Sequence, residues 1–235
     1  YWAIWGGDLY NAKRDEKNDF VRKNFKGIIS LIPGDEIVYK KIYNYDVKIY
    51  FAPYIFPINA DMLKKINHID QDSIRIQVNN SCDISTIEML DILSKFKDEN
   101  IRITTVLSYG KLEYKDGIIH KGKEIFGDKF EYVEDLMSPK EYANHLAKND
   151  ILILNQNRQQ GVGNTIVSAC LGTKIYIKKT VSTNTYFNSI GIKIYNTEDI
   201  ERCSLKELIE YNYKIETIRN AKNYNNENNF VLKWK

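Results

Sequence analysis

The stretch NQNRQQGVGNTIVSACLG, residues 155–172, holds residue types suited to binding an anion. Gly161 and Gly163 allow the backbone to approach a ligand closely. The helical pattern that follows offers unpaired N–H groups and the positive end of a dipole. Arg158 can add a bidentate contact to phosphate oxygens. The stretch therefore indicates either a phosphate cradle or, on equal terms, an ordinary strand-to-helix turn.

Amide side chains add hydrogen-bonding capacity to the same stretch. Gln159, Gln160 and Asn164 can each bond a hydroxyl or a phosphate group. The glycine spacing matches neither the Walker A motif nor the Rossmann fingerprint, so this motif alone does not define the ligand.

Two further loops carry small polar side chains after strand-like runs. Asn79 and Ser81 could face a ligand, or could simply form the turn that caps the next helix. Ser108, Tyr109 and Gly110 could hold a flat ring beside the tyrosine, although loop tyrosines also serve in packing. Two such loops on one sheet edge favour a site more than either does alone.

Two carboxylates also stand at predicted strand ends. Asp8 follows two glycines in WGGDLY, where it could act as a general base or satisfy the turn. Glu134 could accept from a base or a ribose, or be a solvated strand end. The three histidines are interpreted as structural, with His120 in the stretch DGIIHKGK, expected as a surface loop.

Alternating apolar and helical patterns must position these residues. Strands are predicted over residues 73–78, 101–107, 130–134, 151–155, 174–178 and 192–195. Helices are predicted over residues 84–96, 138–149, 163–172, 184–191 and 204–211. Such alternation predicts an α/β domain with a doubly wound parallel sheet. Its ligands bind outside the carboxyl ends of the strands, where the polar loops lie.

The chain divides into four parts. Residues 1–60 hold three short apolar strands and end near two prolines, which stiffen the backbone. Residues 61–72 are expected to be a linker, residues 73–215 the sheet domain, and residues 216–235 a tail. The chain opens without methionine in an apolar segment, so we expect the first residues of the smaller domain to be missing.

Composition excludes several classes of protein. The chain has 235 residues with a net charge of +3, and its basic and acidic residues are mixed, so no nucleic-acid footprint stands out. Three cysteines and three histidines lack zinc spacing or a disulfide framework, which favours a reducing compartment. No apolar run approaches the roughly 20 residues that span a bilayer.

Three segments in this order and spacing resemble a known family. WAIWGGDLY, QVNNSCDISTIEMLDIL with VLSYG, and RQQGVGNTIVSACLGTKIYI resemble the bacterial TDP-Fuc4NAc:lipid II Fuc4NAc transferases, the 4-alpha-L-fucosyltransferases of glycosyltransferase family 56. The resemblance extends from Trp2 to about Ile200. It implies a GT-B fold: a Rossmann-like C-terminal domain with a parallel sheet, and the end of a smaller N-terminal α/β domain on the acceptor side. The chain departs from the family at Asn80, where glycine is more often found nearby.

The resemblance also implies roles for the residues above. Asn79 and Ser81 match the first donor-site loop, and residues 108–110 match the segment near the base. The diphosphate loop is matched by Arg158, Gln159, Gln160, Gly161 and Gly163. Asp8 would face the cleft where acceptor and sugar meet. The donor would be a TDP-sugar, with no metal or other cofactor. The acceptor would be a polyprenyl-diphosphate-linked oligosaccharide used for a cell-surface polysaccharide like enterobacterial common antigen. The expected location is cytoplasmic, with peripheral contact at the inner face of the membrane.

Other readings remain open from the residues alone. The donor could be another nucleotide sugar, such as a UDP-sugar. The chain could also be a non-catalytic nucleotide-binding module, or an α/β domain with no ligand.

Overall fold

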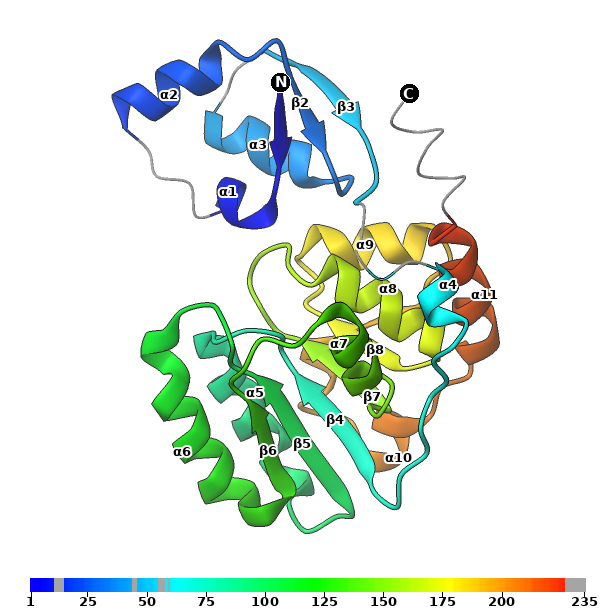
Figure 1. Cartoon of the computed structure of the whole chain (residues 1–235). Helices are drawn as coiled ribbons and strands as arrows, with labels where there is room; N and C mark the ends of the chain where they lie inside the picture. The colour runs from blue at the N-terminus through cyan, green and yellow to red at the C-terminus, as the bar shows by residue number, and fades with distance from the viewer. Residues whose placement is uncertain (11–14, 44–45, 55–57, 59, 227–235) are drawn as a thin grey trace.

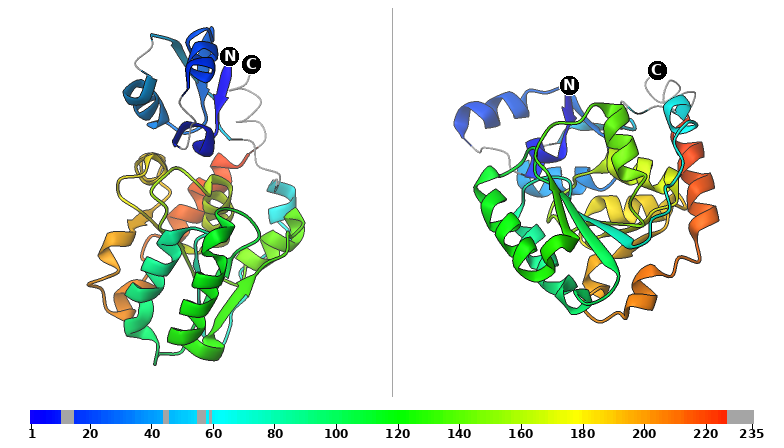
Figure 2. Two further views of the ribbon diagram at one scale, coloured as in Figure 1. Left: turned by 90° about the vertical axis from the view of Figure 1, so that its left-hand side faces the viewer. Right: turned by 60° about the horizontal axis from the view of Figure 1, so that its bottom comes forward.

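The structure is a computed structural model that describes residues 1–10, 15–43, 46–54, 58 and 60–226. It contains two parallel β-sheets with helices packed on them, which confirms the predicted α/β class (Figure 1). In the left view of Figure 2 the smaller sheet and its helices stand above the larger sheet, near α9 (Ser182–Ser189). We call these parts the N-terminal unit and the C-terminal unit.

The N-terminal unit is a three-stranded sheet in the order β1-β2-β3. Its strands are β1 (Trp2–Ile4), β2 (Gly27–Ser30) and β3 (Lys48–Phe51). Its helices are α1 (Gly6–Tyr10), α2 (Glu16–Lys23) and α3 (Asp35–Tyr43). Ile4, Leu9, Ile28, Tyr39 and Tyr43 form its buried core between the sheet and the helices.

The C-terminal unit is a six-stranded parallel sheet in the order β6-β5-β4-β7-β8-β9. Its strands are β4 (Ile74–Val78), β5 (Ile101–Val106), β6 (Phe130–Val133), β7 (Ile151–Leu154), β8 (Lys174–Ile177) and β9 (Ile194–Asn196). The other helices of the chain are α4 (Ala60–Leu63), α5 (Ile84–Leu93), α6 (Lys115–Phe126), α7 (Pro139–Leu146), α8 (Val162–Leu171), α10 (Leu205–Ile209) and α11 (Lys214–Tyr224).

Helices cover both faces of the larger sheet. The central strand β7 shows why, since Leu152 and Leu154 pack toward α7, α8 and α9, while Ile151 and Ile153 pack toward α5 and α6. A strand that is apolar on both faces must be buried on both, so ILIL dictates a central strand of a parallel sheet. No helix among the described residues is both long and apolar enough to cross a membrane.

The strand order reverses between β4 and β7. After β4 the chain adds β5 and then β6 on one side, and it returns to add β7, β8 and β9 on the other. The register pairs Ile76 with Ile151 and Val78 with Ile153. The loops after β4 and β7 therefore emerge side by side at the carboxyl edge, at the switch point where such sheets bind ligands.

Helix boundaries follow local capping chemistry, and two segments differ from the sequence predictions. Ser138 begins α7 with a capping box, and α5 begins after Asp83, whose side chain accepts from the Ser85 N–H. The stretch expected as a loop around His120 is the helix α6. The expected linker over residues 61–72 contains most of α4.

Candidate active site

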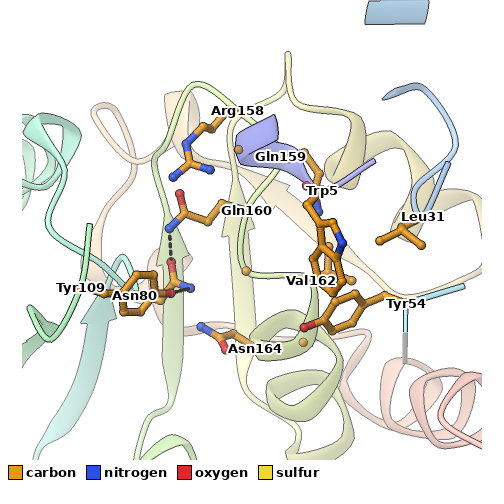
Figure 3. Close-up of a pocket in the computed structure, with 14 residues that line it drawn as sticks. Trp5, Leu31, Tyr54, Asn80, Tyr109, Arg158, Gln159, Gln160, Val162 and Asn164 are labelled. Carbon is orange, nitrogen blue, oxygen red and sulfur yellow. Dashed lines mark hydrogen bonds between the residues drawn. The ribbon is translucent and has the colours of Figure 1, made fainter. Parts of the chain in front are cut away.

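A cavity of about 320 Å³ opens at the switch point, between the two units (Figure 3). This volume lies at the lower end of the range for small-molecule sites, roughly 300–1,000 Å³. The C-terminal unit contributes the loop after β7, the start of α8, Asn80 and Tyr109. The N-terminal unit contributes Trp5, Gly6, Gly7 and Leu31, and the segment after β3 contributes Tyr54.

The polar wall is organised around the buried side chain of Asn80. Its Oδ1 accepts from Gln156 Nε2 at 3.2 Å and from Gln160 Nε2 at 3.3 Å. Its Nδ2 donates to the Tyr109 hydroxyl at 2.8 Å. Gln160 Nε2 also donates to Ser81 Oγ at 2.6 Å. The hydroxyl hydrogen of Tyr109 stays available for a ligand, because Tyr109 acts as an acceptor in this network.

The phosphate-binding features gather at one end of this wall. Gly161 is the residue before α8, with φ 70° and ψ 25°, a left-handed conformation that glycine adopts without steric cost. A Cβ there would lie 2.9 Å from Leu154 Cδ1. No side chain caps α8 and its first turn holds no acidic residue, so its positive end faces the cavity uncompensated.

Arg158 lies beside the N-terminal unit at the same end. A Cβ on Gly7 would be 3.9 Å from Arg158 Nη1. In the parts of the chain that the structure describes, no carboxylate forms an ion pair with Arg158. A guanidinium without a carboxylate partner, next to a free helix N-terminus, suits an anion such as a diphosphate.

The two units approach each other closely at the cavity, where Gly6, which has no side chain, meets Gln159. A Cβ on Gly6 would overlap the backbone carbonyl and the side chain of Gln159. Only glycine allows this close approach of α1 to the loop after β7. The contact fixes Trp5, the preceding residue, at the mouth of the cavity.

Two aromatic rings and Leu31 make the opposite wall, which Figure 3 shows facing Asn80, Tyr109 and Arg158. The Trp5 and Tyr54 rings meet edge to face, with centroids 5.1 Å apart at 87°. Trp5 is 51% exposed although it is large and apolar. The cavity therefore has a polar wall from the C-terminal unit and an apolar wall that includes the N-terminal unit.

Titration states follow from burial. Burial raises the pKa of Tyr109 above its usual range, more than the hydrogen bonds from Gln160 and Asn80 lower it, so Tyr109 is a neutral hydroxyl at pH 7. Burial lowers the pKa of His145 to about 4, and its ring stacks on Tyr142. Neutral His145 supports the wall from behind, since Tyr142 accepts a hydrogen bond from Asn164 at 2.8 Å.

A match to a protein-family model identifies the family of the chain. The family model described as 4-alpha-L-fucosyltransferase glycosyl transferase group 56 matches residues 1–234. The chain belongs to this family. Its members are glycosyltransferases, so the group 56 chain is of the glycosyltransferase class. No curated protein sequence matches it.

Solved structures of glycosyltransferases share the group 56 chain's GT-B fold. A glycosyltransferase from Rickettsia africae is 10% identical with a TM-score of 0.73, over 98% of this chain and 67% of that one. A sucrose-phosphate synthase from Thermosynechococcus elongatus is 12% identical with a TM-score of 0.69, over 96% and 61%. An E. coli structure described as trehalose-6-phosphate bound with UDP-2-fluoro glucose is 10% identical with a TM-score of 0.66, over 99% and 64%. The group 56 chain thus spans roughly two thirds of these structures.

Seven of the twelve predicted donor-binding residues of the group 56 chain line the cavity. They are Tyr109, Arg158, Gln159, Gln160, Gly161, Gly163 and Asn164. Ser81 acts behind this layer through its hydrogen bond from Gln160. The loop after β7 thus lines a cavity of ligand size.

Other predicted residues lie elsewhere. Asn79 points into the protein, where it donates to Ser85 and Thr86 and accepts from the Asn155 N–H. Glu134 forms an ion pair with Lys115 outside the cavity. Asn79 bonds partners inside the protein and Glu134 pairs with Lys115 near the surface, so neither lines the cavity.

Three more predicted residues fall outside the lining. Gly110 packs on the backbone of Cys82, where a Cβ would not fit. Ser108 is half-buried and does not line the cavity. Asp8 is exposed on α1 and also lies outside the lining, although Gly6 and Gly7 before it belong to the cavity.

The sequence did not predict seven further lining residues, which are Trp5, Gly6, Gly7, Leu31, Tyr54, Asn80 and Val162. Asn80 departs from the family pattern, yet it organises the polar wall. Within the described ranges no cluster of three His, Cys, Asp or Glu side chains could hold a metal ion, and the metal-independent reaction stays a prediction.

Proposed function

We propose that this chain binds a TDP-linked deoxyamino sugar and transfers a Fuc4NAc-like group to a polyprenyl-diphosphate-linked oligosaccharide, in the synthesis of a cell-surface polysaccharide like enterobacterial common antigen. The observation that carries the proposal is the switch-point cavity, where Arg158 and the uncapped start of α8 face one space. Family membership supports the reaction class. A related structure described with UDP-2-fluoro glucose supports a nucleotide-sugar donor.

The proposed reaction is a displacement at the anomeric carbon of the donor sugar. The bond from this carbon to the diphosphate oxygen breaks, and TDP leaves with the bonding electrons. An acceptor hydroxyl oxygen forms the new bond and gives up its proton. The developing charge on the diphosphate is stabilised by Arg158 and the N–H groups that begin α8.

Asp8 is proposed to orient the acceptor or take its proton. It is exposed on α1 directly after the two cavity glycines, on the side that an acceptor would approach. An exposed carboxylate at this position can reach an acceptor hydroxyl through a small displacement or through one bridging water.

Peripheral contact with the membrane would bring the enzyme to its lipid-linked acceptor. On α2, Phe20 is 68% exposed and lies next to exposed Val21 and Lys17. On α3, exposed Ile37 is followed by exposed Lys40 and Lys41. Apolar side chains flanked by lysines favour an anionic lipid surface. Sedimentation with anionic and with neutral vesicles measures this, and equal binding to both would contradict it.

Substitution of Arg158 tests the donor site. Arg158→Ala should weaken TDP binding at least tenfold, because a charge-assisted bidentate contact is lost, while the thermal unfolding midpoint stays near that of the wild type. Arg102→Ala is the control, since that arginine lies at the start of β5, away from the carboxyl edge, and pairs with Glu131 of β6. Titration calorimetry with TDP and UDP gives the affinities. Unchanged TDP affinity in Arg158→Ala would rule out its role, and tighter binding of UDP would replace the proposed nucleotide.

A further inference from the structure

The hydrogen bonds of the polar wall form a chain that runs in one direction. Gln156 is 2% exposed and donates from Nε2 to Asn80 Oδ1 at 3.2 Å, and Gln160 donates to the same oxygen at 3.3 Å. Because that oxygen meets two amide donors, the Asn80 side chain must turn its amino group toward Tyr109. Asn80 Nδ2 therefore donates to the Tyr109 hydroxyl oxygen, at 2.8 Å. Each group donates to the next, and Tyr109 is the last of the chain.

The hydrogen of the Tyr109 hydroxyl is the free end of this chain. Burial raises the pKa of Tyr109, and the hydrogen bonds from Gln160 and Asn80 partly offset that rise. A hydrogen bond lowers the pKa of a phenol when the phenol oxygen accepts it, so this oxygen accepts from both amides. Within the described part of the chain, no atom accepts the hydroxyl hydrogen. Since Tyr109 lines the cavity, its hydrogen is available to an acceptor on a ligand.

The surroundings of this hydrogen favour a phosphate over a hydroxyl group of the ligand. Against the larger effect of burial, the charge of Arg158 lowers the pKa of Tyr109, so the two groups act on one space. Figure 3 shows both on the same wall, with Gln160 and Asn80 between them. Phosphate oxygens only accept, whereas a ligand hydroxyl also brings a hydrogen. The Tyr109 oxygen cannot take that hydrogen, because two amides already occupy it.

We infer that the Tyr109 hydroxyl donates a hydrogen bond to the leaving diphosphate, and that Asn80 is the positioning residue that turns the hydroxyl hydrogen toward it. This inference rests on the proposed function. It adds a neutral donor to Arg158 and the N–H groups of α8, and it assigns Tyr109 to the phosphates, where the family resemblance implied a place near the base. No proton is transferred, because burial raises the pKa of Tyr109 and keeps the phenol neutral.

The experiment compares TDP with thymidine, which has the same base and pentose and no phosphate. Titration calorimetry on the whole chain gives the affinity for TDP, and competition with TDP gives the affinity for thymidine. Tyr109→Phe keeps the ring and removes the hydroxyl, so TDP binding should weaken about tenfold, as expected for a lost hydrogen bond to a charged group. The affinity for thymidine should stay within about twofold of wild type. Tyr114→Phe, nearby in sequence and outside the cavity, is the control and should change neither affinity.

Asn80→Asp tests the positioning role, because a carboxylate oxygen replaces the amino group that donates to Tyr109. This oxygen would take the hydroxyl hydrogen and reverse the last bond of the chain. TDP binding should weaken more than about tenfold, since the donor is withdrawn and a negative charge is added. In this background the further change Tyr109→Phe should cost less than about twofold. If Asn80→Asp does not fold, Asn80→Ala leaves the hydroxyl without direction, and Tyr109→Phe should then cost less than it does in the wild type.

The outcomes separate this inference from the proposed function. If Tyr109→Phe weakens TDP and thymidine equally, the hydroxyl contacts the nucleoside and the inference is overturned, as it is by an unchanged TDP affinity. An undiminished effect of Tyr109→Phe in the Asn80 variants overturns the positioning role. In these cases TDP binding that depends on Arg158 keeps the proposed function. If UDP binds in place of TDP, the proposed nucleotide is overturned, and UDP with uridine tests the inference. Absence of binding by both nucleotides overturns both.

Discussion

Asn164 reaches the cavity with one end of its amide already bonded. Its Nδ2 donates to the Tyr142 hydroxyl at 2.8 Å, and the residue is only 6% exposed. The hydrogen bond fixes the plane of an amide that lines the cavity. Tyr142 in turn stacks on the neutral ring of His145 at 10°. Ligand affinity should thus depend on a tyrosine that does not touch the ligand.

Tyr142→Phe tests this dependence. Loss of one hydrogen bond should lower TDP affinity about fivefold and stability by about 1 kcal/mol. Tyr176→Phe is the matched control, because its hydroxyl donates to the Leu208 carbonyl at 3.1 Å in the core, away from the cavity. Calorimetry and urea unfolding give the two quantities. Equal TDP affinities in the two variants would mean that Tyr142 has no positioning role.

At the scale of elements, α6 shows where local pattern fails. Its twelve residues include Gly117 and Gly122, and glycine is a weak helix former, so the sequence favoured a loop. The helix forms because Ile118 and Phe126 pack into the core against α5. Gly122 is required, since a Cβ there would overlap the ring of Phe130. Tertiary packing therefore overrides the local propensity.

The two glycines of α6 form a matched pair for mutation. Gly117→Ala should raise the free energy of unfolding by about 0.5–1 kcal/mol, because its Cβ would lie 3.5 Å from Ile87 Cδ1, an ordinary contact. Gly122→Ala should lower it by about 1–3 kcal/mol through overpacking. Urea unfolding measures both. Stabilisation by both substitutions would show that the ring of Phe130 moves aside at little cost.

At the scale of the whole molecule, one buried carboxylate joins the two units. Asp35 begins α3, and its Oδ1 accepts from Tyr10 at 2.9 Å and from Ser182 of α9 at 2.7 Å. Burial raises the pKa of Asp35, more than the two hydroxyl donors lower it. The folded protein therefore holds this proton to higher pH than the unfolded chain does. Its contribution favours folding at low pH and declines as pH rises through the raised value.

Asp35→Asn keeps the acceptor oxygen and removes the charge. Its stability at pH 7 should equal or exceed that of wild type, and the pH-dependent contribution above about pH 3.9 should vanish. Asp35→Ala leaves two hydroxyls unpaired and should cost about 1–3 kcal/mol. Urea unfolding from about pH 3 to pH 8 compares the two variants with the wild type. If Asp35→Asn were as unstable as Asp35→Ala at pH 7, the negative charge itself would hold the units together.

Periodicity and capping residues determine most elements from the sequence alone. Three signals depend only on residues that are close together in the sequence: the strand ILIL, which is apolar on both faces, the capping box at Ser138, and the glycine after α8. A sequence pattern therefore contains these signals directly. The family segments likewise indicated the loop after β7.

Only the tertiary structure decided which polar residues face the cavity. Asn79 and Asn80 are neighbours of the same type, yet Asn79 turns inward with φ 54° and Asn80 lines the cavity. Side-chain direction at a strand end depends on backbone angles that the surrounding packing selects. The aromatic wall depends on contacts between units distant in sequence, such as Gly6 with Gln159, because no local pattern encodes which loop another segment will meet.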